Sequence, residues 1–193
     1  MAKPKNLQKA LEIQRVVARL FAYNGYHATS MREIGRAIGM NQSSLYHYFK
    51  SKEDILFKIM NNAVDEALAI LEGICSADLS PEEKLSDVLG FYTRYYAGDQ
   101  ERLTILVNEM HSLSKPFHRV LLKKQRRYVL LIRSILDELA LEDKMNTLHP
   151  GVATFAFFGM VHYTVKWYHE KGPVKPDELA NQFVEIFTKG ILK

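Results

Sequence analysis

The chain has 193 residues, of which 47% are hydrophobic and 25% charged, so it can bury a core and is not expected to be disordered throughout. Its net charge of +4 is unevenly spread: residues 1–60 hold ten Lys or Arg against four Asp or Glu, and the rest hold sixteen against eighteen. This asymmetry predicts that the N-terminal third meets a polyanion. The single cysteine, Cys75, excludes an internal disulfide, and the charges scattered through the first residues exclude a secretory signal, so we expect a cytoplasmic protein.

The first two predicted elements are helices. Apolar residues recur at helical spacing over 10–21, and the pair Asn24-Gly25 supplies a left-handed residue that ends this helix. Residues 30–33, Ser-Met-Arg-Glu, form a capping box, which starts a second helix. Gly39 ends that helix after a few residues, so the second helix is predicted to be short.

A third short helix is predicted behind Asn41, a good N-cap, and it covers residues 42–49. At 100° per residue, Leu45 and Phe49 point inward and Tyr48 lies at the margin. The outward positions are Ser43, Tyr46 and His47, with Gln42 and Ser44 beside them. Two short helices joined by a tight turn and braced by a preceding helix are typical of a helix-turn-helix, whose second helix enters the DNA major groove. From spacing alone, an exposed helix that carries two tyrosines by chance remains an alternative.

The remaining elements are also predicted to be helices. A fourth runs from Ser51 to about Gly73, a fifth opens at Ser80-Pro81, and others cover 100–113, 116–139, 150–169 and 176–192. Residues 151–165 are strongly apolar but too short to span a membrane. No stretch alternates with period 2, so the sequence predicts an all-α fold of about nine helices.

Signals for catalysis and for metal binding are missing from the sequence. There is no Gly-x-Ser-x-Gly, no phosphate loop and no carboxylate pair on an apolar helix face, so we expect no enzymatic activity. His111 and His118 are seven residues apart, as are His162 and His169. Such a spacing separates two helical residues by about 10.5 Å, too far for one metal ion, and no metal site is predicted.

Residues 25–56 strongly resemble the DNA-binding signature of TetR/AcrR-family transcriptional repressors. The matching residues are Gly25, Tyr26, Thr29, Ile34, Gly39, Leu45, Tyr46, Phe49, Lys52 and Glu53. The chain departs from the signature at Gly35, Ile38, Asn41, Ser43 and Tyr48. The resemblance implies a DNA-binding head over residues 1–52 and a helical ligand-binding and dimerisation domain over 53–193.

The resemblance also implies roles for individual residues of the head. Base-edge contacts fall to Gln42, Ser43 and His47. Phosphate contacts fall to Thr29, Ser44, Tyr46, Tyr48 and Lys52, and Arg32 could reach either backbone or base. The implied partner is a palindromic double-stranded DNA operator bound by a homodimer.

For the C-terminal part, the resemblance implies dimerisation through the last two helices and an effector cavity. Candidate ligand-binding residues are Phe91, Tyr95, Met110, Phe117, Tyr128, Phe158, Tyr163 and Trp167, although core packing is an equal alternative for each. Residues 157–191 are more loosely similar to regulators of lipid and sterol catabolism that respond to acyl-CoA thioesters. We therefore expect a repressor released by an acyl-CoA or a related lipid metabolite.

Three alternatives stay open. The effector could be a cationic drug, as in efflux regulators, and Glu109 is the candidate acid for that. An enzyme acting on thioesters is a rival with no supporting motif. A basic stripe on the predicted helix 116–139 lies opposite its apolar face and contacts either solvent or ligand; its members are Arg119, Lys123, Arg126 and Arg133.

Overall fold

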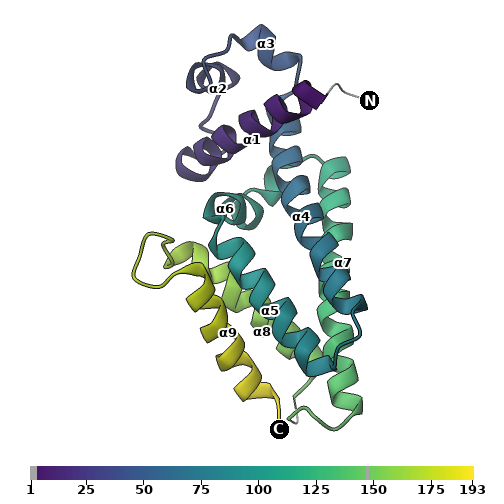
Figure 1. Ribbon diagram of the computed structural model, residues 1–193. Helices are drawn as coiled ribbons and strands as arrows, with labels where there is room; N and C mark the ends of the chain where they lie inside the picture. The colour runs from purple at the N-terminus through teal and green to yellow at the C-terminus, as the bar shows by residue number, and fades with distance from the viewer. Residues whose placement is uncertain (1–3, 147) are drawn as a thin grey trace. The chain divides into compact units, whose positions relative to one another are not determined.

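The computed structural model describes residues 4–146 and 148–193, and within them the regular secondary structure is helical (Figure 1). The only pairing of strand type among these residues is an isolated bridge between Met145 and Leu192. The predicted all-α fold is confirmed. The chain forms two compact units, one running to Ala63 and adding Glu101–Leu121, the other made of Val64–Gln100 and Leu122–Lys193.

The first unit contains α1 (Pro4–Asn24), α2 (Met31–Ala37), α3 (Gln42–Tyr46) and the beginning of α4 (Lys52–Ser76). It also holds most of α6 (Gln100–Asn108), the 3-10 turn η1 (Met110–Ser112) and the start of α7 (Lys115–Leu141). Its core consists of apolar side chains from the predicted inward faces, among them Ile13, Val17, Phe21, Ile34, Leu45, Phe49, Ile55 and Ile59.

The third helix is shorter than predicted. We expected residues 42–49, whereas α3 ends at Tyr46. The chain tightens there, because the amides of His47 and Tyr48 bond to carbonyls three residues back, at 3.3 and 2.9 Å. Phe49 still donates its amide to the Leu45 carbonyl at 3.0 Å and is 1% exposed, so the predicted inward direction of its ring is correct.

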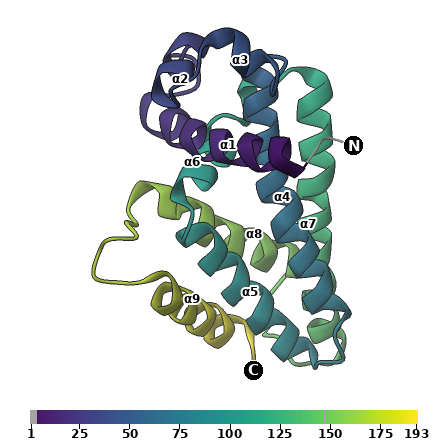
Figure 2. The same ribbon diagram turned by 45° about the horizontal axis from the view of Figure 1, so that its top comes forward.

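In the second unit, α5 (Pro81–Ala97) packs against both α8 (Pro150–His162) and α9 (Pro176–Ile191), as Figures 1 and 2 show. The predicted start of α5 is confirmed: Pro81 is its first residue, and Ser80 and Glu83 form a second capping box. Large apolar side chains fill the space between these helices, including Leu85, Val88, Leu89, Phe157 and Phe187.

Two predicted helices end early. The prediction for 150–169 was too long, because α8 ends at His162 and is followed by the 3-10 turn η2 (Tyr163–Lys166). The Thr164 hydroxyl donates to the Val161 carbonyl at 2.6 Å and so competes with helical bonding there. The prediction for 100–113 was likewise too long: α6 ends at Asn108, and a bend at Glu109 leads into η1. None of the described helices is long and apolar enough to cross a bilayer.

Candidate nucleic-acid interface

The two short helices of the head begin at the residues that the sequence indicates. Ser30 Oγ accepts from the Glu33 amide at 3.2 Å, and the Glu33 carboxylate accepts from the Ser30 amide at 2.7 Å. Asn41 Oδ1 accepts from the Ser44 amide at 2.7 Å. Each helix therefore has a capped N-terminus, which satisfies amides that a helix leaves unpaired.

The turn between α2 and α3 depends on two glycines. Gly39 has φ +67°, in the left-handed region that a side chain disfavours. A Cβ added to Gly35 would lie 2.6 Å from the Met40 carbonyl oxygen, and the Met40 amide donates to the Gly35 carbonyl at 2.9 Å. The turn thus lies directly against α2 and leaves no room for a Cβ at residue 35. This explains why Gly35 occupies a position where the resembled signature usually has alanine.

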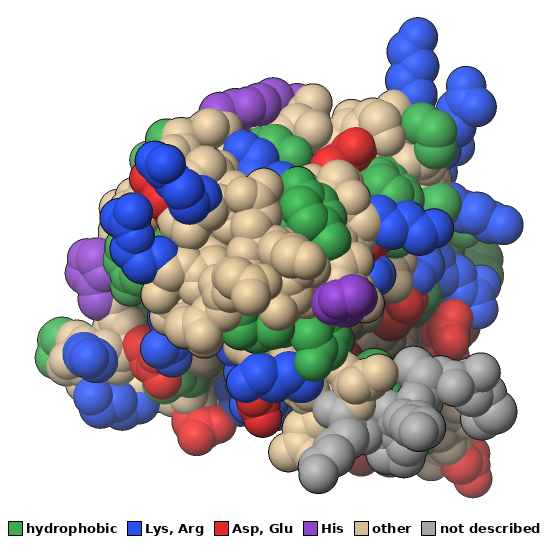
Figure 3. All heavy atoms as spheres, turned by 90° about the horizontal axis from the view of Figure 1, so that it is seen from above, with side chains coloured by type: hydrophobic (Ala, Val, Ile, Leu, Met, Phe, Trp, Pro, Cys, Tyr) green, Lys and Arg blue, Asp and Glu red, His purple; other side chains and the backbone are tan. Residues whose placement is uncertain are grey.

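The inner and outer faces of α3 are distinct. Leu45 is completely buried, whereas Gln42, Ser43, Tyr46 and His47 are exposed and Ser44 and Tyr48 are half-buried. Gln42 Nε2 donates to the Tyr46 hydroxyl at 3.4 Å, so these two outward side chains are neighbours. Figure 3 looks down on this end of the chain and shows a surface made largely of polar and backbone atoms, with Lys and Arg side chains toward its margin.

Two residues predicted to contact phosphate hold the head together internally. The Lys52 ammonium donates to the carbonyls of Tyr26 and Thr29, both at 2.8 Å, and lies 4.2 Å from the centre of the Tyr26 ring. Burial lowers the pKa of Lys52, while Glu109 and Glu33 act in the opposite direction. Thr29 is 3% exposed and its hydroxyl donates to the Gly25 carbonyl at 2.9 Å. Arg32, by contrast, is exposed.

The sequence did not predict the contacts of two carboxylates, Glu53 and Glu109, which join distant parts of the first unit. Glu109 accepts from the Tyr26 amide at 3.3 Å, and Glu53 accepts from the Ser114 amide at 2.6 Å. Burial raises the pKa of the Tyr26 hydroxyl, and these two acids raise it further. The partners are 83 and 61 residues apart, so no local pattern in the sequence could have found them.

The structure divides the predicted ligand-binding residues between the two units. Met110 and Phe117 belong to the first unit, where the Phe117 ring stacks on Phe57 with centroids 4.2 Å apart. The second unit contains the other six, of which two are buried (Tyr128 and Phe158), two are half-buried (Phe91 and Tyr95) and two are exposed (Tyr163 and Trp167).

A buried aromatic cluster lies inside the second unit, and the sequence did not single out its central residues. Tyr92 hydrogen-bonds to His162 Nε2 at 2.9 Å, and its ring lies 4.7 Å from Tyr96 and 5.9 Å from Tyr128. Burial lowers the pKa of His162 to about 4. The Thr93 hydroxyl, also buried, finds no hydrogen-bond partner within the described residues. This interior therefore combines aromatic surface with a few polar groups.

The basic stripe of α7 is largely open to solvent. Arg119, Lys123 and Arg126 are exposed, and Arg133 lies 2.8 Å from Asp137 on the next turn.

Comparisons with known proteins agree with this architecture. Residues 15–59 match the family described as bacterial regulatory proteins, tetR family, and residues 78–191 match the tetracyclin repressor-like C-terminal domain. The chain is 26% identical to the HTH-type transcriptional repressor KstR2 of Mycolicibacterium smegmatis, over 93% of this chain and 89% of that protein.

Two solved structures resemble the chain over nearly its whole length. A TetR-family transcriptional regulator from Bordetella parapertussis is 31% identical, covers 94% of each chain and superposes with a TM-score of 0.84. AibR in complex with isovaleryl coenzyme A and operator DNA is 25% identical over 92% of this chain and 96% of that chain, with a TM-score of 0.82. The helix-turn-helix, the helical C-terminal domain and these matches together identify the chain as a member of the TetR family of DNA-binding transcriptional regulators.

Proposed function

We propose that the protein is a dimeric transcriptional repressor that binds a palindromic operator and is released by a small apolar effector. The observation that carries the proposal is the exposed polar face of α3 opposite the fully buried Leu45. Gln42, Ser43 and His47 are assigned to base edges, because short or amide side chains let the helix approach the groove floor and glutamine can pair with adenine.

The phosphate contacts are assigned to residues around the same helix. Tyr46, Ser44 and Tyr48 carry hydroxyls beside the recognition face, and Arg32 is exposed on α2. Thr29 and Lys52 are proposed to support these contacts from behind. Their bonds to carbonyls of residues 25–29 fix the backbone of the turn before α2, and Lys52 adds positive charge to the head. We keep residues 1–52 as the DNA-binding part and 53–193 as the effector-binding and dimerisation part.

Exposed apolar side chains on the last two helices support dimerisation. Val152 and Phe155 on α8 are 65% and 64% exposed, and Ile186 on α9 is 61% exposed. Gly159 and Gly190, on the same helices, have no atom within 4 Å of an added Cβ, so a second chain could approach closely there. A homodimer is also what a palindromic operator requires, because each half-site needs its own recognition helix.

An acyl-CoA thioester is the proposed effector. AibR, which shares the fold along nearly the whole chain, was crystallised with isovaleryl coenzyme A. The aromatic interior around Tyr92, Tyr128 and Phe158 offers apolar surface for an acyl chain, and the unpaired Thr93 hydroxyl offers a polar contact. The alternative of a cationic drug is less well supported, because its candidate acid, Glu109, lies in the first unit and accepts bonds from Tyr26 and Ser112.

A gel-shift titration tests both halves of the proposal. The full chain is mixed with DNA from upstream of its own gene, and short-chain acyl-CoA, long-chain acyl-CoA, free fatty acid and a cationic dye are added in turn. We expect a specific complex that acyl-CoA dissolves and free coenzyme A does not. Tyr46→Ala should abolish the complex, and Tyr23→Ala, a matched change at an 80% exposed tyrosine of α1, should leave it intact. Equal loss in both variants would refute the assigned interface, and release by the dye alone would refute the thioester.

A further inference from the structure

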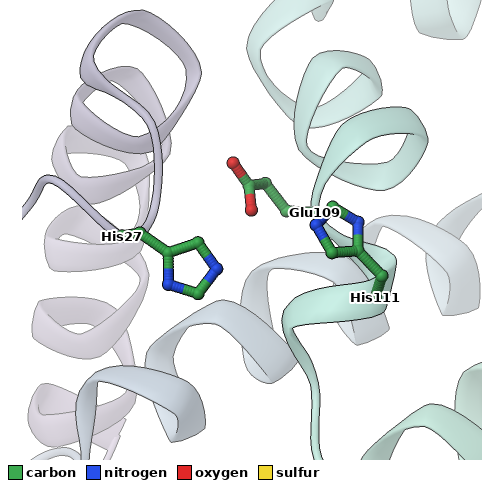
Figure 4. Close-up of side chains that lie close together, drawn as sticks. All are labelled: His27, Glu109 and His111. Atoms are coloured by element: carbon green, nitrogen blue, oxygen red, sulfur yellow. The ribbon is translucent and has the colours of Figure 1, made fainter.

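Three potential metal ligands meet in the first unit, away from the recognition face of α3. They are His27, in the turn between α1 and α2, Glu109, in the bend after α6, and His111, in η1. One donor atom from each lies within 4.8 Å of the donor atoms of the other two. Figure 4 shows the two imidazole rings and the carboxylate turned toward one another.

We propose that His27, Glu109 and His111 bind one divalent transition-metal ion of the Zn²⁺ type. Two imidazole nitrogens and one carboxylate oxygen are a donor set that Zn²⁺ uses in proteins, with the fourth position left for water or another ligand. Nitrogen donors also favour such ions over Mg²⁺ or Ca²⁺, which prefer oxygen alone. The site is independent of the effector interior in the second unit and goes beyond the repressor function proposed above.

The distances permit closure of the site. Bonds of about 2.0–2.1 Å to a tetrahedral ion place donor atoms about 3.4 Å apart, so any two donor atoms need to approach each other by at most about 1.4 Å. Rotation about side-chain bonds supplies this, since His27 and His111 are exposed and Glu109 is half-buried. His111 makes no hydrogen bond to any described residue and can turn freely toward the ion.

The surroundings already orient two of the ligands. Glu109 accepts from the Tyr26 amide at 3.3 Å and from the Ser112 hydroxyl at 2.8 Å. The same hydroxyl lies 3.0 Å from His27 Nε2, so Ser112 bridges the imidazole and the carboxylate. The Ser112 hydroxyl thus holds the imidazole and the carboxylate near each other, and a bound ion would take over this bridge.

A bound ion would link the turn before α2 to the corner between α6 and α7. His27 precedes Glu109 by 82 residues and His111 by 84, so an ion bound by all three would join distant segments of the first unit. Metal that binds only the folded chain stabilises it, by an amount that grows with the ratio of the free metal concentration to the dissociation constant. Zn²⁺ should therefore raise the melting temperature as well as bind.

The test uses the full chain after treatment with EDTA and dialysis. Zn²⁺ is titrated in competition with a chromogenic chelator, Co²⁺ is titrated for its visible absorption bands, and thermal unfolding is followed with and without Zn²⁺. We expect one ion per chain, Co²⁺ bands of low-symmetry coordination, and a higher melting temperature with Zn²⁺.

Matched variants separate this site from adventitious binding by surface histidines. His111→Asn removes a ligand that supports no described hydrogen bond, so the fold should persist while Zn²⁺ affinity falls at least tenfold; Glu109→Gln should lower it similarly. His169→Asn removes an exposed histidine of the second unit and should change nothing. The proposal is overturned if the unaltered chain and His111→Asn bind Zn²⁺ equally, or if His169→Asn weakens binding as much as His111→Asn does.

Discussion

Helices α3 and α8 differ in how clearly their sequences separate inside from outside. In α3 the apolar Leu45 is buried and the polar positions are exposed, so periodicity identifies both the core side and the side that we propose faces DNA. In α8 buried Phe157 and exposed Phe155 are the same residue type two positions apart. Hydrophobic patterning identifies the buried face of a helix when the opposite face is polar, as in α3, and it fails when the opposite face is also apolar, as in α8.

The largest effect should come from a charge on the exposed face of α8. We expect Phe155→Asp to weaken the proposed homodimer by a factor of 100 or more, because a twofold interface contains the substitution twice and buries each carboxylate. Analytical ultracentrifugation measures the change. Leu130→Asp on α7, at a residue 62% exposed, is the control and should leave association unchanged. A dimer unaffected by Phe155→Asp would mean that the exposed face of α8 lies outside the dimer interface and faces solvent.

The buried side of α8 can be tested through His162. Its pKa of about 4 lies below the unfolded value of 6.5, so the unfolded chain binds a proton that the folded chain does not as pH falls through this window. Stability contributed by the neutral ring is therefore full above about pH 6.5 and is lost between there and pH 4. A difference of 2.5 pKa units corresponds to about 3.4 kcal/mol, and the loss should be smaller than this because the half-buried ring is partly screened by water.

Urea unfolding at pH 7 and pH 5 gives the change in the free energy of unfolding between the two pH values. His162→Gln should reduce this change. His169→Gln, at an exposed site, should keep it. An unchanged pH dependence in His162→Gln would show that other groups cause it.

A methyl group added to each of two helical glycines should have opposite effects. Gly35→Ala forces a Cβ toward the Met40 carbonyl oxygen and should destabilise the chain by about 1–3 kcal/mol. Gly73→Ala, in α4, meets nothing within 4 Å and should stabilise by about 0.5–1 kcal/mol. Thermal denaturation measures the stability of both variants. A stabilising Gly35→Ala would mean that the turn before α3 is looser than the structure describes.

Two further substitutions divide the outer face of α3 by role. Tyr46→Phe removes one hydroxyl and should weaken binding to operator and to unrelated DNA alike, by about 1 kcal/mol. Gln42→Ala should instead alter preference at one base pair, by about 1–3 kcal/mol. Fluorescence anisotropy against a set of single-base operator variants measures both. Base-specific loss in Tyr46→Phe would reverse the assigned roles.

Local signals in the sequence predicted the beginnings of helices better than their ends. The capping boxes at Ser30 and Ser80 and the cap at Asn41 each involve residues at most three positions apart, so the pattern contains the whole interaction. The end of α8 depends on a 3-10 tightening at residues 163–166, where the low helix propensity of Thr164 and Val165 is only a weak signal and no glycine or proline marks the end.

Contacts distant in sequence could not be predicted at all. The histidines were paired by their spacing along one helix, which could not bring His27 together with His111. For the same reason the sequence did not predict that Lys52 bonds to the Tyr26 and Thr29 carbonyls. Its expected phosphate contact was taken from family resemblance.

The position of Lys52 also bears on the entropy of DNA recognition. A free lysine loses up to about 2 kcal/mol of rotamer freedom when its ammonium is fixed. Lys52 is already held by the Tyr26 and Thr29 carbonyls, so it undergoes this ordering when the head folds. In the proposed operator complex its charge would act on the duplex as part of a preorganised surface, without the motional loss that a flexible side chain suffers on contact.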